Sequence, residues 1–143
     1  MRQVFTVRRR SVLVALVSLV VLGALAAPVV ADDKKADYRV VDPSVVYLGN
    51  PRLFKKPVVV NCDRVYRAIP EYQEILEKNL TDRDVRYHFL MRKASDKFAT
   101  AIRTIASEGS YDLVAGVGAV VPSNTDTPAV PEATDAAIKK LPS

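Results

Sequence analysis

The 143-residue sequence contains no tryptophan, one histidine and one cysteine, Cys62. A single cysteine cannot form an internal disulfide, so the fold must be stable without one. His88 and Cys62 alone would leave a zinc site short of ligands, because structural zinc sites take four. A nucleophilic Cys62 would need an adjacent base, and nothing in the sequence places His88 beside it. We therefore expect no catalytic residues, no enzyme activity, no cofactor and no metal site, and we interpret Cys62 as a buried, inert thiol.

The first 31 residues have the pattern of a secretory signal peptide. Arg2 and Arg8–Arg10 precede an uncharged apolar stretch that ends in PVVA at residues 28–31. We expect cleavage after Ala31 and a periplasmic mature protein, which contacts the membrane only through this segment. An uncleaved anchor is the alternative, because the apolar stretch approaches the ~20 residues that cross a bilayer.

The N-terminal segment also carries most of the net charge of +5. It contains four arginines and no acidic residue, so residues 32–143 have 17 basic and 16 acidic side chains, a net charge of +1. Nucleic-acid binding needs a basic face. The remaining sequence has no such excess, and we expect no nucleic-acid partner.

The rest of the chain divides into an N-terminal extension, residues 32–56, and a domain at residues 57–143. The extension has turn signals at Asp42–Pro43 and at 49–51. Its string VVDPSVVYLGNP echoes VVNCDRVYRAIP at 59–70. An added strand that covers a sheet edge and a chance similarity in valine-rich sequence are both open explanations of this echo.

Within the domain, composition predicts a strand at 58–62, helices over 63–108, a strand pair at 111–121 and a C-terminal helix at 132–141. The valine run of the first strand is typical of burial on both faces. Pro70 interrupts the first helix, so we expect a turn and a restart with Pro70 in the first helical turn. Apolar residues at three-four spacing then predict an antiparallel helical hairpin that ends near Gly109.

The predicted fold class is therefore α+β, with a small β-sheet or barrel, a projecting helical hairpin and a C-terminal helix. So few strands bury little apolar surface, and we expect oligomerisation to complete the core. The predicted oligomer core consists of the apolar strand residues Val58, Val59, Val60, Tyr111, Leu113, Val114, Val120 and Val121.

Three strings, collinear over roughly residues 57–141, resemble the Skp/OmpH family of periplasmic chaperones. They are VVVNCDRVYRAIPEYQEI, AIRTIASEGSYDLVAGVGAVV and VPEATDAAIKKL. The resemblance implies a homotrimer with a central β-structure, whose helical hairpins enclose unfolded outer-membrane proteins. The hairpin here is short, with a second helix of about 38 Å.

From this resemblance we expect a chaperone that binds unfolded or partly folded outer-membrane proteins. Apolar residues near the hairpin tip, Tyr87, Leu90 and Met91, are the candidate client contacts, although their spacing equally fits helix packing. The alternative function is a non-catalytic structural or envelope-associated oligomer that keeps the fold without a client cavity.

Overall fold

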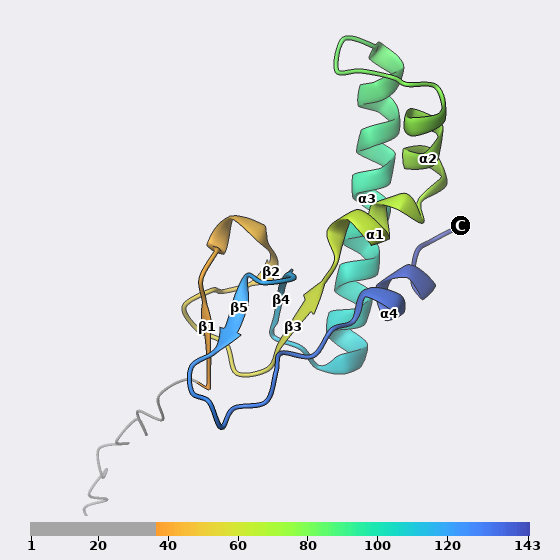
Figure 1. Ribbon diagram of the computed structural model, residues 1–143. Helices are drawn as coiled ribbons and strands as arrows, with labels where there is room; N and C mark the ends of the chain where they lie inside the picture. Colours follow the sequence, from red (N-terminus) through yellow and green to blue (C-terminus); the bar gives the residue numbers. More distant parts are fainter. Residues whose placement is uncertain (1–36) are drawn as a thin grey trace, which may run out of the picture. The chain divides into compact units, whose positions relative to one another are not determined.

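The computed structural model describes residues 37–143, and the expected signal peptide at residues 1–31 lies outside them. Helices and strands are mixed in the described part, in agreement with the predicted α+β class (Figure 1). In chain order the elements are β1 (Tyr38–Val40), the 3₁₀ helix η1 (Pro43–Val45), β2 (Val46–Gly49), β3 (Pro57–Val60), α1 (Cys62–Arg67), α2 (Pro70–Glu77), α3 (Val85–Gly109), β4 (Leu113–Gly116), β5 (Val120–Pro122) and α4 (Thr134–Lys139).

The strands of the described residues form two small open sheets and no closed barrel. One sheet has three strands in the order β2-β4-β3, and the other pairs β1 with β5. β3 and β4 are parallel, with Val58 opposite Val114. Parallel neighbours need a long crossover connection, and the helices α1, α2 and α3 provide it. β2 runs antiparallel on the other side of β4.

Both strands expected within residues 111–121 exist, but the prediction that they pair with each other is wrong. β4 already has a partner on each side, β2 and β3, so it has no free edge for β5. Gly118, with φ +84°, turns the chain after β4, and β5 then pairs with β1 of the extension. The extension at residues 32–56 therefore supplies a strand to each sheet.

β3 is buried along its whole length, as its valine run predicts. Its side chains alternate between two apolar clusters on opposite faces of the central sheet. Val58 and Val60 belong to the cluster that includes α3 residues Phe98 and Ile102. Val59 belongs to the second cluster, with residues of β4 and β5. Helices thus cover one face of the sheet, and the β1–β5 pair packs against the other.

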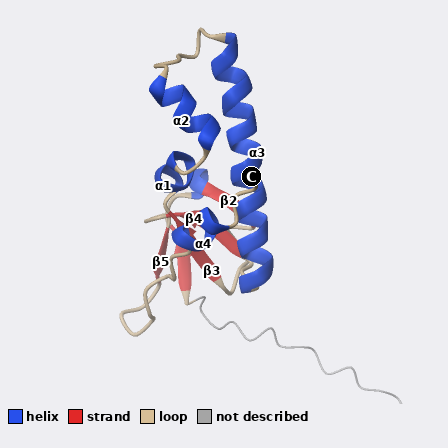
Figure 2. Ribbon diagram, turned by 90° about the vertical axis from the view of Figure 1, so that its right-hand side faces the viewer, coloured by secondary structure: helices blue, strands red, loops and turns tan. Residues whose placement is uncertain are grey.

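The helical restart at Pro70 is confirmed. Ile69 is extended, with φ −90° and ψ 122°, and Pro70 begins α2, because proline disfavours helical backbone at the preceding residue. α2 packs along α3, and their free end points away from the strands (Figures 1 and 2). Asn79 is left-handed, with φ 50°, and the loop at 78–84 joins the two helices.

The second helix of the hairpin includes Gly109, the residue that was expected to stop it. Ser110 takes the left-handed conformation instead, with φ 52°. A Cβ atom at Gly109 would lie 2.0 Å from a ring carbon of Tyr111, so any other residue there would push this ring away. Tyr111 therefore packs closely against the end of α3.

Candidate functional site

The free end of the hairpin is the first candidate binding surface, and ion pairs fix its two helices. Lys97 on α3 lies 3.1 Å from the Glu71 carboxylate on α2. Glu74 contacts both Lys78, at 2.8 Å, and Arg86 of α3. The pair of Glu71 and Lys97 joins the start of α2 to the middle of α3, and the pair of Glu74 and Arg86 joins the helices nearer the tip.

The carboxylates in these pairs are held in their ionised form. Burial by itself raises the pKa of Glu71, but hydrogen bonds from its own backbone and from Lys97 outweigh that effect and leave the pKa below its usual value. The hydrogen bond from Lys78 is the main cause that lowers the pKa of Glu74, and Arg86 adds to it. Both glutamates therefore strengthen the hairpin as anions.

The three predicted client contacts lie largely on the packing side of this hairpin. Leu90 is only 6 % exposed, and it belongs to the stripe that faces the core. Tyr87 and Met91 are half-buried. Leu90 is thus unavailable to a client, because three-four spacing marks the face that packs against a neighbouring helix.

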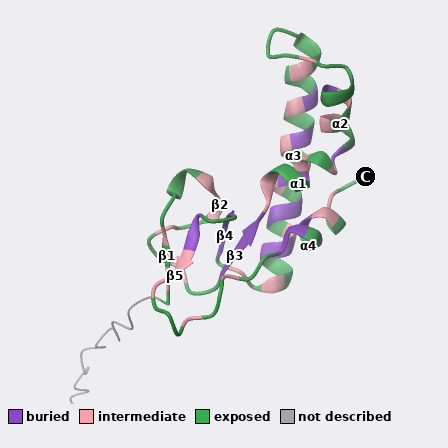
Figure 3. Ribbon diagram, viewed as in Figure 1, coloured by how far each residue is buried: buried purple, intermediate pink, exposed green. Residues whose placement is uncertain are grey.

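Different apolar side chains are exposed at the tip. Val85 is 86 % exposed, Phe89 58 % and Leu76 44 %. Val85 and Phe89 are four residues apart and share one face of α3, while Leu76 lies near the end of α2. Figure 3 shows this end of the hairpin mostly exposed, in contrast to the buried strands β3 and β4. We call Leu76, Val85 and Phe89 the tip patch.

The tip patch has cationic neighbours. The Lys93 ammonium lies 4.6 Å from the centroid of the Phe89 ring, within cation–π range. Arg83 and Arg92 take part in none of the salt bridges among residues 37–143. Some basic groups of the hairpin are therefore free of ion pairs within this range.

Cys62 lies elsewhere, at the first turn of α1 beside the sheet. It is half-buried rather than fully buried as expected. Its surroundings are aromatic: Tyr66 stacks on Phe98 at a centroid distance of 4.9 Å, and Tyr47 meets the same ring edge-on at 5.1 Å. Burial, with the nearby thiol as a further cause, raises the pKa of Tyr47 well above its usual value.

The structure does not bring His88 to Cys62. His88 lies in the first turn of α3, where its Nε2 atom is 2.6 Å from the carbonyl oxygen of Asp82. Residues 37–143 also contain no group of three or more His, Cys, Asp or Glu side chains that could hold a metal ion.

The predicted oligomer core lies inside the single chain. Six of its eight residues are buried there, and Tyr111 and Val121 are half-buried. Val58, Val60 and Val114 pack under the helices, while Val59, Leu113 and Val120 pack between the sheets. The six buried side chains hold the chain's own strands together, so a contact between copies would have to use residues that keep exposed surface.

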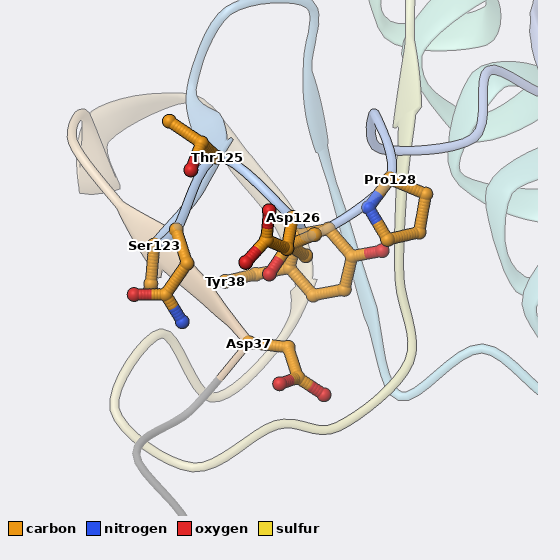
Figure 4. Close-up of a pocket in the computed structure, with 8 residues that line it drawn as sticks. Asp37, Tyr38, Ser123, Thr125, Asp126 and Pro128 are labelled. Atoms are coloured by element: carbon orange, nitrogen blue, oxygen red, sulfur yellow. The ribbon is translucent and has the colours of Figure 1, made fainter.

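An open hollow of about 800 Å³ lies where β1 begins and β5 ends (Figure 4). Its lining is mainly polar and includes the carboxylates of Asp37 and Asp126 beside Tyr38. None of these residues was predicted from the sequence as part of a site. Two carboxylates do not by themselves define a site.

No helix among residues 37–143 is long and apolar enough to span a membrane. Comparisons of the chain with protein-family models, with curated proteins and with solved structures find no match. The similarity to Skp/OmpH chaperones therefore rests on the three strings quoted above.

Proposed function

We propose that the chain is an exported, non-enzymatic chaperone of the Skp/OmpH type, which holds unfolded or partly folded outer-membrane proteins in the periplasm. The observation that carries this proposal is the tip patch. Three large apolar side chains are exposed, two on the first turns of α3 and one near the end of α2, and this end of the hairpin points away from the strands. An exposed apolar patch is a common mark of a protein-binding surface, and apolar segments are what an unfolded client presents.

The size of the patch limits the strength of binding. Burial of apolar surface contributes about 25 cal/mol per Å², and three partly exposed side chains offer little area. One hairpin therefore binds weakly. Several linked tips would bind one client far more tightly, because the second contact becomes intramolecular. This reasoning supports a homotrimer, assembled through residues other than the six buried strand residues.

The reach of the hairpin sets a second limit. α2 has 8 residues and α3 has 25, which correspond to about 12 Å and 38 Å. Part of α3 packs against the sheet and contributes nothing to the reach. The proposed clients are therefore short segments or small barrels rather than large ones.

The test is suppression of aggregation for a small and a large unfolded outer-membrane barrel. The wild-type protein should protect the small barrel better than the large one. The double variant Val85→Ser/Phe89→Ser should lose protection while its circular dichroism stays unchanged. Leu53→Ser/Val117→Ser is the matched control, because both residues are exposed and apolar but lie outside the hairpin.

Equal loss of protection in the two double variants would contradict a specific role of the tip. Equal protection of both barrels would contradict the size limit. A wild-type protein that protects neither barrel would favour the alternative, a structural oligomer of the cell envelope.

A further inference from the structure

The central sheet has one uncovered edge among the described residues. The outer side of β3 is covered by the chain itself: the Val59 N–H donates to the carbonyl oxygen of Pro131 at 2.9 Å, and the Ala133 N–H donates to the Val59 carbonyl at 2.9 Å. β2 is the strand at the opposite edge. Within residues 37–143, no strand pairs with its outer side.

An apolar groove of about 160 Å³ lies beside this edge, between β2 and α3. Its lining residues are Tyr47, Leu48, Phe98, Ala99, Ile102 and Arg103. A cavity of about 150 Å³ holds one benzene molecule, so this groove has room for a single aromatic or branched aliphatic side chain. It is well below the roughly 300–1,000 Å³ of typical small-molecule pockets.

The groove has one charged residue, and its charge is positive. Arg103 takes part in none of the salt bridges among residues 37–143. Arginine pairs readily with carboxylates, which it can contact through two parallel hydrogen bonds. The unpaired edge, the side-chain-sized groove and the cation therefore favour one kind of occupant: an extended chain with an apolar residue and a carboxylate close to it.

We infer that β2 is a strand-addition site for an extended peptide segment, which places one apolar side chain in the groove and one carboxylate at Arg103. Strand addition uses main-chain hydrogen bonds for affinity and a pocket for specificity. The inference rests on the proposed function in one respect, which is that the bound segment belongs to an unfolded client protein. It uses residues different from those of the tip patch, so the two sites can be tested separately.

The probe is a fluorescein-labelled hexapeptide in which threonine alternates with valine, phenylalanine and aspartate in that order, so that the phenylalanine and the aspartate point to the same face of the extended chain. Its binding to the full chain is measured by fluorescence anisotropy. Ala99→Trp, which fills the groove, and Arg103→Glu, which reverses its charge, should each weaken binding at least tenfold. Arg103→Lys should weaken it less, and Lys139→Glu, on α4 outside the groove, should leave it unchanged.

A second peptide with N-methyl groups on alternate residues tests the main-chain contacts. It should bind at least tenfold more weakly than the first, because methylation removes the donors that pair with a strand edge. Equal binding of the two peptides, or unchanged binding by Ala99→Trp and Arg103→Glu, would overturn the inference.

The remaining outcomes separate this inference from the proposed function. Binding of the peptide by Val85→Ser/Phe89→Ser, together with lost protection of clients, would support two distinct sites. A wild-type protein that protects clients but does not bind the peptide would refute the strand-addition site alone. If Ala99→Trp instead lowers the mass of a wild-type oligomer in light scattering and no peptide binds, the groove is a contact between copies, and the inference is wrong.

Discussion

Phe98 and Phe89 offer a direct test of how the chain divides its aromatic residues between core and surface. Both lie on α3, but Phe98 is 7 % exposed and Phe89 58 %. Phe98 contacts Tyr47 of β2 and Tyr66 of α1, so one ring joins three elements. Replacing it by alanine removes the buried ring and both aromatic contacts.

The expected cost of Phe98→Ala is about 3–5 kcal/mol in the free energy of unfolding, the usual range for such a core truncation. Small domains are stable by only about 5–15 kcal/mol, so this variant should be close to unfolding. Phe98→Leu keeps most of the volume and loses mainly the two ring pairs, at about 0.5–1.5 kcal/mol each. Phe89→Ala should change stability by less than about 0.5 kcal/mol, as exposed substitutions do.

Urea unfolding followed by circular dichroism at 222 nm measures these differences. The midpoint should fall steeply for Phe98→Ala, moderately for Phe98→Leu and hardly at all for Phe89→Ala. Client protection is measured at a urea concentration where both alanine variants are folded. It should be weakened by Phe89→Ala and retained by Phe98→Ala. Similar midpoints for the two alanine variants would refute the assignment of Phe98 to the core.

Four further predictions use other parts of the chain. The folded state lowers the pKa of Glu71 and Glu74, so their contribution to stability is fully present above the unfolded pKa of about 4.3 and is lost as pH falls through their folded pKa values. Thermal melts from pH 7 to pH 3 should show this loss of stability. The loss should be smaller in the double variant Glu71→Gln/Glu74→Gln. Val60→Asp should abolish the cooperative unfolding transition, because Val60 has no exposed surface and an unpaired carboxylate there is strongly unfavourable; a native-like melt would contradict the packing. Cys62→Ala should keep client protection and lower stability only modestly, and a loss of protection would indicate a functional thiol. N-terminal sequencing of the exported protein should begin at or near Asp32, whereas an intact Met1 in a membrane fraction would indicate an anchor.

The helical break was the best-predicted feature of the fold, because it follows from local backbone rules. Proline fixes its own φ angle and restricts the residue before it, so the extended Ile69 and the restart at Pro70 follow from two neighbouring residues. The burial of β3 could be predicted equally well, because an uninterrupted valine run has no polar face to expose. Both features depend on short-range chemistry that is contained in the sequence.

Strand pairing could not be predicted in the same way. Residues 113–116 and 120–122 read as two strands around a glycine turn, and such a pattern favours a hairpin. The actual partners of β4 are β2 and β3, which are distant in sequence and already occupy both of its edges. Nothing in the local sequence of β4 distinguishes a neighbour across a turn from a neighbour across a helical crossover.

The candidate client surface was missed because Val85 and Phe89 lie outside the apolar stripe of α3. The stripe through Leu90 was correctly recognised as a helix face, but it packs inside the hairpin. α2 ends at Glu77, and Val85 and Phe89 lie on the first turns of α3, with their side chains largely exposed. Their signal was present in the sequence as two apolar residues outside the stripe, four positions apart.

Because β3 and β4 pair directly with each other, the helical hairpin between them can change in length without a change in the sheet. Asp112, just before β4, accepts hydrogen bonds from the backbone N–H groups of Lys55 and Lys56, just before β3, at 2.7 Å and 2.8 Å. These bonds anchor the end of the helical insertion where it returns to the sheet. Equal additions to α2 and α3 at the tip would leave this anchor intact, and a longer connection costs little extra closure entropy. The hairpin could then be lengthened in steps of about 5.4 Å, one helical turn, without any change to the sheets or to the ring contacts of Tyr47, Tyr66 and Phe98.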